Sequence, residues 1–285
     1  MYHLDNAGLR VSILDPVAER KHIGSRYCAG GYIWQVTDAG KGELFSGPAF
    51  PNPNPPTFDG QGLPEAFEIA LGGSAAKVGE DVWVIGVGKV RRESATKPFH
   101  VRNNPTIMEL APWKVEHAGA MITMTARQVF RDWDLILERK ILLKGRTLIS
   151  ATSIRNQGKA DAPIRWFAHP FFPHAGYAVG KTSLECDFPF WVPVAGGFRF
   201  NQGMLERNPD HDWNAGCYQL LNLPFGGPLE IAQKHPTLGE VKIECRFPLA
   251  WMPLWANPNT VSFEPYYHTV LHPGNHTEWS IRYHL

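Results

Sequence analysis

Residues 120–155, AMITMTARQVFRDWDLILERKILLKGRTLISATSIR, carry the clearest pattern in the chain. They divide into three runs of strand length, at 120–129, 134–143 and 147–155. Lys144-Gly145 separates the second run from the third, and a glycine between two such runs is typical of a β-hairpin. The stretch therefore predicts three consecutive antiparallel strands.

The third run also indicates how these strands pack. Successive strand residues point to opposite faces of a sheet, so Leu148, Ser150, Thr152 and Ile154 share one face. Neither face of this run is strongly charged, and we expect both to be covered, as in two sheets packed face to face. Further strand-like runs occur at 8–14, 24–36, 81–90, 162–167, 187–193, 217–223, 240–247, 260–264 and 277–283.

Composition supports an all-β fold. The 285 residues include 27 Gly and 24 Pro, which argues against long helices and for short strands joined by turns. There is no confident helical stripe, internal repeat or domain linker. We predict one large antiparallel β-sandwich that occupies residues 1–285 as a single domain.

Charge and cysteine usage limit the possible partners and compartment. A net charge of +1 gives no electrostatic reason to expect nucleic acid or an anionic membrane as a partner. The four cysteines form no CxxC pair, which favours buried free thiols over a metal site. The N-terminus lacks the features of a signal peptide, and no apolar run is long enough to cross a bilayer. We expect a cytoplasmic protein, either monomeric or homodimeric.

Two segments have the residue types of a carbohydrate site. His169 lies within WFAHPFFP (166–173), where prolines and aromatic rings surround an imidazole. Glu264 ends an apolar run just before Pro265. Sugar rings pack their C–H faces on aromatic side chains, while their hydroxyls need fixed donors and acceptors. Taken alone, a histidine beside aromatic rings is more often a core residue, and a single glutamate is weak evidence of a site.

Both segments resemble the galactose mutarotase-like superfamily, which includes aldose 1-epimerase. Asn156 to Phe172, NQGKADAPIRWFAHPFF, is similar to a strand pair of that family, and Ser262 to Tyr283, SFEPYYHTVLHPGNHTEWSIRY, to its closing segment. GSRYCAGGYI (24–33), GLPEAFE (62–68), IGVGKV (85–90) and KPFHV (97–101) are closer to a divergent branch. The resemblance spans most of the chain and implies the family's large antiparallel β-sandwich.

The resemblance implies interconversion of the α and β anomers of an aldose without metal or cofactor. By the family pattern Glu264 is the base and His169 the acid, acting from opposite sides of one sugar ring. A second active-site histidine of the family has no matching motif here, and His100 is the nearest candidate in position. Additional candidates for substrate binding are Arg26, Glu65, Lys89, His100, Arg102 and Trp166. For each of them except Trp166, an ordinary role on the surface or at a strand end is an equal alternative.

Other functions have weaker support. An Arg26/Arg102 pair could hold the phosphate of a phosphorylated sugar. A non-catalytic sugar-binding or sugar-sensing protein on the same fold is the main alternative. The Gly86/Gly88 pair lacks the third glycine and the helix of a nucleotide site. Four histidines near Glu264 could suggest a metal, but Pro273-Gly274 rules out the helix that would align them.

Overall fold

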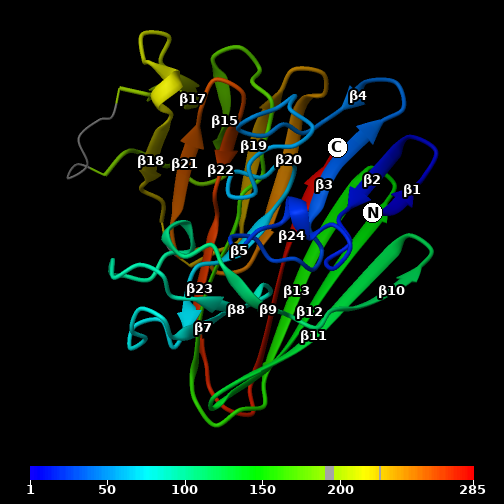
Figure 1. Cartoon of the computed structure of the whole chain (residues 1–285). Helices are drawn as coiled ribbons and strands as arrows, with labels where there is room; N and C mark the ends of the chain where they lie inside the picture. The colour runs from blue at the N-terminus through cyan, green and yellow to red at the C-terminus, as the bar shows by residue number, and fades with distance from the viewer. Residues whose placement is uncertain (190–195, 225) are drawn as a thin grey trace.

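The computed structural model describes residues 1–189, 196–224 and 226–285. Its regular secondary structure is almost entirely β-strand, and every pairing between these strands is antiparallel (Figure 1). Helical structure in the described residues is limited to three single 3₁₀ turns, at Arg20–His22, Val101–Asn103 and Trp213–Ala215. The predicted all-β class and antiparallel sandwich are confirmed.

A ten-stranded sheet forms the largest layer, and it joins segments that are distant in the sequence. The three strands predicted from residues 120–155 lie side by side next to its edge strand, and β24 from the C-terminus pairs with the last of them (Figure 1). Its strands, in spatial order, are β10 (Lys114–Ala118), β11 (Met121–Phe130), β12 (Trp133–Lys144), β13 (Thr147–Asn156), β24 (His276–His284), β20 (Gly239–Arg246), β19 (Leu229–His235), β15 (Ala178–Thr182), β17 (Met204–Arg207) and β16 (Phe198–Asn201).

Four smaller sheets complete the fold. Two have three strands: β23 (Tyr266–Leu271), β14 (Ala162–Ala168) and β5 (Glu65–Phe67) form one, and β18 (Cys217–Leu221), β21 (Met252–Ala256) and β22 (Val261–Phe263) form the other. Two have four strands: β1 (Tyr2–Asp5), β2 (Leu9–Ile13), β3 (Ile33–Asp38) and β4 (Gly42–Glu43), and then β6 (Ala70–Leu71), β7 (Asp81–Val84), β8 (Gly88–Arg91) and β9 (Ile107–Leu110).

The main core lies between the ten-stranded sheet and the smaller sheets. Trp279 of β24 contacts Trp166 of β14 and Phe67 of β5, with ring centroids 5.5 and 6.2 Å apart. Leu148 and Ile154 of β13 are fully buried on the same side. The other face of β13, with Ile149, Ala151 and Ser153, is partly exposed. The prediction that both faces are covered is therefore wrong for this strand.

The three-stranded sheet β23-β14-β5 is covered on both sides, and this positions the candidate site. One side contributes Trp166 to the main core. The other side contributes Phe167 and Tyr266 to a second core, which Tyr27 and Tyr32 of the N-terminal region complete. Alternation along β14 thus sends Trp166 and Phe167, neighbours in sequence, into different cores.

Three of the predicted strand runs have a different structure. In the run at 24–36, the first part forms turns and the strand β3 begins only at Ile33. Residues 81–90, expected as one run, form the β7–β8 hairpin, because Ile85-Gly86-Val87 makes its turn with Gly86 at a φ of 78°. In the run predicted at 187–193, Asp187 forms an isolated bridge with Asn222, and residues 190–193 lie outside the described residues.

Candidate active site

The two residues singled out by the sequence follow strand ends that lie side by side. β14 ends at Ala168 and His169-Pro170 follows, while β22 ends at Phe263 and Glu264-Pro265 follows. Proline cannot donate to a strand ladder, which explains why both strands stop there. Phe172 and Val261 exchange two backbone hydrogen bonds of 3.0 Å, and this bridge brings the two segments together.

His169 and Glu264 contact each other directly. Nε2 of His169 lies 3.3 Å from Oε1 of Glu264, and the residues are only 3% and 4% exposed. Nδ1 of His169 lies 3.0 Å from Oγ of Ser262. The sequence-based expectation that the two groups face each other across a sugar ring is wrong for this structure, because a gap of hydrogen-bond length cannot hold a ring.

Aromatic side chains enclose the imidazole of His169. Its ring centroid lies 4.3 Å from that of Phe171, 5.7 Å from Trp255, 5.8 Å from Phe167 and 6.4 Å from Tyr27. These rings exclude water without supplying a charge to balance an imidazolium. The surroundings therefore favour the neutral form of the histidine.

Burial has opposite effects on the two pKa values. It raises the pKa of Glu264 to about 8, with Arg26 opposing the rise and Glu68 adding to it. It holds the pKa of His169 well below its ordinary value, and the positive charge of Arg26 lowers it further. Burial therefore favours the neutral form of both groups, a protonated carboxyl beside an imidazole that can accept its proton.

Arg26 and Arg102 meet at the ring of Phe58. Their guanidinium carbons lie 4.3 and 5.1 Å from its centroid, and Nη1 of Arg26 donates to the Phe58 carbonyl at 3.0 Å. His100 is adjacent, with its ring centroid 6.2 Å from that of Phe58. A cavity of about 300 Å³ opens here, lined by both arginines and by Asp59. The proline-rich loop at residues 46–64 supplies Phe58 and Asp59 to its lining.

Glu65 and Trp166 lie in the main core rather than with the pair. Oε2 of Glu65 accepts from Trp166 Nε1 at 2.9 Å and forms an ion pair with Arg139, while Oε1 accepts from Ser150 Oγ at 2.5 Å. Both Glu65 and Arg139 are almost fully buried. The sequence could not reveal this network, because Arg139 is 74 positions from Glu65 and sits on another sheet. Lys89 pairs instead with Glu109 near the surface, at 2.6 Å.

Four residues that the sequence reading did not select also belong to this region. Tyr266 donates from its hydroxyl to Glu68 at 2.9 Å and stacks on Phe167, with centroids 4.7 Å apart. Trp255 packs against His169, and Tyr218 is its neighbour across the β18–β21 pairing. Burial and the charges of Glu264 and Glu68 raise the pKa of Tyr218 to about 12. The alternation of β5 and β23 could have indicated Glu68 and Tyr266, as these residues share a face with Phe167.

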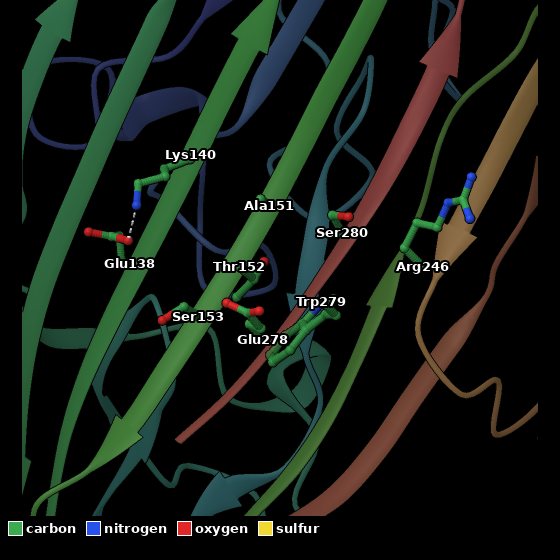
Figure 2. Close-up of a pocket in the computed structure, with 9 residues that line it drawn as sticks. All are labelled: Glu138, Lys140, Ala151, Thr152, Ser153, Arg246, Glu278, Trp279 and Ser280. Atoms are coloured by element: carbon green, nitrogen blue, oxygen red, sulfur yellow. Dashed lines mark ion pairs between the residues drawn. The ribbon is translucent and has the colours of Figure 1, made fainter. Parts of the chain in front are cut away.

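A larger cavity, of about 420 Å³, is distant from the pair in the fold. It crosses the outer face of the ten-stranded sheet on strands β12, β13, β24 and β20 (Figure 2). An ion pair of 2.6 Å between Glu138 and Lys140 borders it. Its lining contains neither His169 nor Glu264, and it lacks exposed aromatic rings for a sugar: Glu138, Lys140, Ala151, Thr152, Ser153, Arg246, Glu278, Trp279 and Ser280.

The described part of the chain contains no group of three or more histidine, cysteine or acidic side chains arranged to hold a metal. None of its helices is long and apolar enough to span a membrane.

Comparison with known proteins assigns the fold. A galactose mutarotase related enzyme from Lactobacillus acidophilus superposes with a TM-score of 0.61 at 14% identity, over 100% of this chain and 97% of the other. A candidate aldose 1-epimerase from Escherichia coli gives 0.63 at 15% identity, over 99% and 97%. A GalM/aldose epimerase homologue from C. elegans gives 0.56 at 12% identity, over 99% and 97%.

The chain thus has the galactose mutarotase-like β-sandwich fold, as the sequence resemblance implied. No protein-family model matches its sequence, and no curated protein matches it either. At these identities the structural likeness is evidence for the fold, and the function has to be argued from the site.

Proposed function

We propose that this protein is an aldose 1-epimerase-like enzyme that interconverts the α and β anomers of a sugar. The observation that carries the proposal is the contact between His169 Nε2 and Glu264 Oε1, buried among aromatic rings at two adjoining strand ends. Anomer exchange needs one proton donor and one acceptor, and this pair supplies both. The fold shared with epimerase-like proteins supports the same conclusion.

Direct contact within the pair is compatible with this chemistry. The anomeric hydroxyl and the ring oxygen of an aldose are bonded to the same carbon, so two catalytic groups in contact can reach both oxygens from one side. We expect the sugar to approach this side and to replace the contact with hydrogen bonds to its own oxygens. Catalysis from opposite sides of the ring is then unnecessary.

The protonation of the pair assigns roles opposite to those implied by the family resemblance. Glu264 gives its proton to the ring oxygen while Nε2 of His169 takes the proton of the anomeric hydroxyl. The bond between the anomeric carbon and the ring oxygen breaks, its electron pair goes to the ring oxygen, and a free aldehyde forms. After rotation, closure on the other face returns both protons and restores the pair.

The charged groups beside the pair suggest which sugars bind. Arg26 acts on the pKa values of both His169 and Glu264, and it borders the cavity that Arg102 also lines. Two guanidinium groups at one cavity suit an anion, since guanidinium binds phosphate oxygens with paired hydrogen bonds. We therefore include phosphorylated aldoses among the proposed substrates, with the phosphate at Arg26 and Arg102.

A non-catalytic sugar-binding or sugar-sensing protein is the second candidate. The low exposure of the pair and the lack of a second histidine in contact with it, among the described residues, favour this alternative. Polarimetry of freshly dissolved aldoses, both neutral and phosphorylated, separates the two. Faster equilibration that is lost in His169→Gln and Glu264→Gln supports the enzyme, whereas saturable binding without acceleration supports the sensor.

A further inference from the structure

Ser262 is placed by its strand to contact His169. It precedes Glu264 by two residues, so alternation directs both side chains to one side and sends Phe263 into the main core. Ser262 is fully buried, and it pairs across β21 and β22 with Trp255, whose ring also packs against His169. Its Oγ lies 3.0 Å from Nδ1 of His169, while Glu264 lies against Nε2 of the same ring.

The hydrogen bond at Nδ1 decides what Nε2 can do. A neutral imidazole has one donor nitrogen and one acceptor nitrogen. If Ser262 donates to Nδ1, then Nε2–H faces Glu264, which accepts either as an ionised carboxylate in an almost fully buried site or through the carbonyl oxygen of the acid, whose own proton then cannot be used by this histidine. If Ser262 accepts from Nδ1–H, then Nε2 accepts from a protonated Glu264. Both ring nitrogens are then hydrogen-bonded and no group is charged. Burial favours the second arrangement.

The other charged groups near the ring do not reverse this preference. Arg26 is the positive charge that acts on both His169 and Glu264, and it favours an ionised carboxylate. Glu68 acts on Glu264 in the opposite sense, and the remaining neighbours of the imidazole are the uncharged rings of Phe167, Phe171, Trp255 and Tyr27. Arg26 already donates to the Phe58 carbonyl.

We propose that Ser262 is a positioning residue that accepts from Nδ1–H of His169 and so holds Nε2 as the proton acceptor facing Glu264. This inference rests on the proposed function and adds to it. When Nε2 takes a proton from the anomeric hydroxyl, Nδ1–H keeps its acceptor, so the same serine stabilises both the neutral ring and the imidazolium. The serine exchanges no proton with the sugar.

The tautomer of His169 is measurable in the ligand-free protein by ¹⁵N NMR, with His169→Gln identifying its signals. We expect the Nδ1–H tautomer in the wild type and in Ser262→Thr, and a mixture of tautomers in Ser262→Ala. Thr260→Val is the matched control, because it removes a buried hydroxyl bond of 2.9 Å to the Phe172 carbonyl on the same segment without touching the ring. We expect this control to leave the tautomer unchanged.

Anomer exchange gives the second readout. Losing the serine acceptor should slow exchange on the order of tenfold in Ser262→Ala, with recovery in Ser262→Thr. An Nε2–H tautomer in the wild type would overturn the inference even if the protein is active. An Nδ1–H tautomer in a protein that accelerates no sugar would support the positioning of His169 and overturn the proposed enzyme function alone. The wild-type spectrum decides the matter even if a variant does not fold.

Discussion

Nε2 of His169 and Oε1 of Glu264 lie 3.3 Å apart, although the residues are 95 positions apart in the chain and follow different sheets. The two groups lie within reach of a hydrogen bond to each other. Aromatic rings and Ser262 surround the imidazole. Burial disfavours both charged forms, and so favours a protonated Glu264 beside a neutral His169. This arrangement makes several outcomes measurable.

Removing either member of the pair should remove most of the catalytic effect. General acid–base assistance is typically worth ~10²–10⁴-fold, and we expect His169→Gln and Glu264→Gln each to lower kcat by about that factor. The double variant should be scarcely slower than either single variant, since the groups act as a unit. Steady-state polarimetry provides the rates, and additive losses would mean that the two residues act independently.

The rate should depend on pH through the proton content of the pair. We expect activity to fall above a pH of about 8 as Glu264 loses its proton, and to fall at acidic pH as His169 gains one. With Glu264 as base and His169 as acid, the active pair carries the same number of protons. The pH profile therefore tests the proton content of the pair and not which residue is the acid. A rate that stays constant from pH 7 to pH 10 would contradict the proposed proton content.

The raised pKa of Glu264 should also lower the stability of the protein at neutral and alkaline pH. The unfolded carboxyl ionises near 4.5 and the folded one near 8, so the contribution of Glu264 to stability is greatest below pH 4.5 and decreases as pH rises through this interval. At pH 7 this difference amounts to about 3 kcal/mol. Glu264→Gln, whose amide can donate to Nε2 as the protonated acid does, should be more stable than the wild type by that order.

Thermal unfolding measured from pH 5 to pH 8 checks this prediction. The gap between Glu264→Gln and the wild type should widen as pH rises. Glu116→Gln is the control, because it alters an exposed glutamate that is not among the groups acting on the pKa of Glu264. A Glu264→Gln variant that is less stable at every pH would show that the carboxyl is ionised in the folded protein.

The Glu65–Arg139 pair should matter for stability and not for catalysis. Glu65→Ala leaves a buried guanidinium without its carboxylate, which typically costs about 3–5 kcal/mol. Urea unfolding measures this loss. Glu109→Ala breaks the exposed pair with Lys89 and should cost less than about 1 kcal/mol. A Glu65→Ala protein that remains as stable as the wild type would contradict the structural role.

Arg102 should distinguish phosphorylated from neutral sugars. Arg102→Ala should raise KM for a phosphorylated aldose about tenfold, the effect of roughly one charge-assisted hydrogen bond, and leave KM for the neutral sugar unchanged. Arg127→Ala, which alters an exposed arginine paired with Asp134 on another part of the surface, is the control. Equal effects of Arg102→Ala on KM for both sugars would contradict the proposal that Arg102 binds the phosphate.

Much of the fold could be predicted from the sequence because the strands within residues 120–155 have clear local patterns. Alternation in 147–155 and the Lys144-Gly145 turn need no long-range information, and β12 and β13 follow them closely. Short strands such as β5 and β21 were missed, because three to five residues without clear alternation are fixed by their pairing partners.

The site was predictable only in part for the same reason. Strand ends and prolines marked His169 and Glu264, and a resemblance linked them. How separate sheets pack decides the distance between His169 and Glu264, the contact of Ser262 with the imidazole, and the role of Glu65. Trp166 shows the limit most clearly: its neighbour Phe167 packs against the imidazole, while Trp166 itself faces the main core.

Exchange between the anomeric protons of an aldose, followed by two-dimensional NMR with and without the protein, tests the central claim most directly. The panel should contain neutral and phosphorylated aldoses. We expect faster exchange for at least one sugar with the wild type, and the spontaneous rate with the His169→Gln/Glu264→Gln double variant. Exchange at the spontaneous rate for every sugar with the wild type, or acceleration that persists in the double variant, would contradict it.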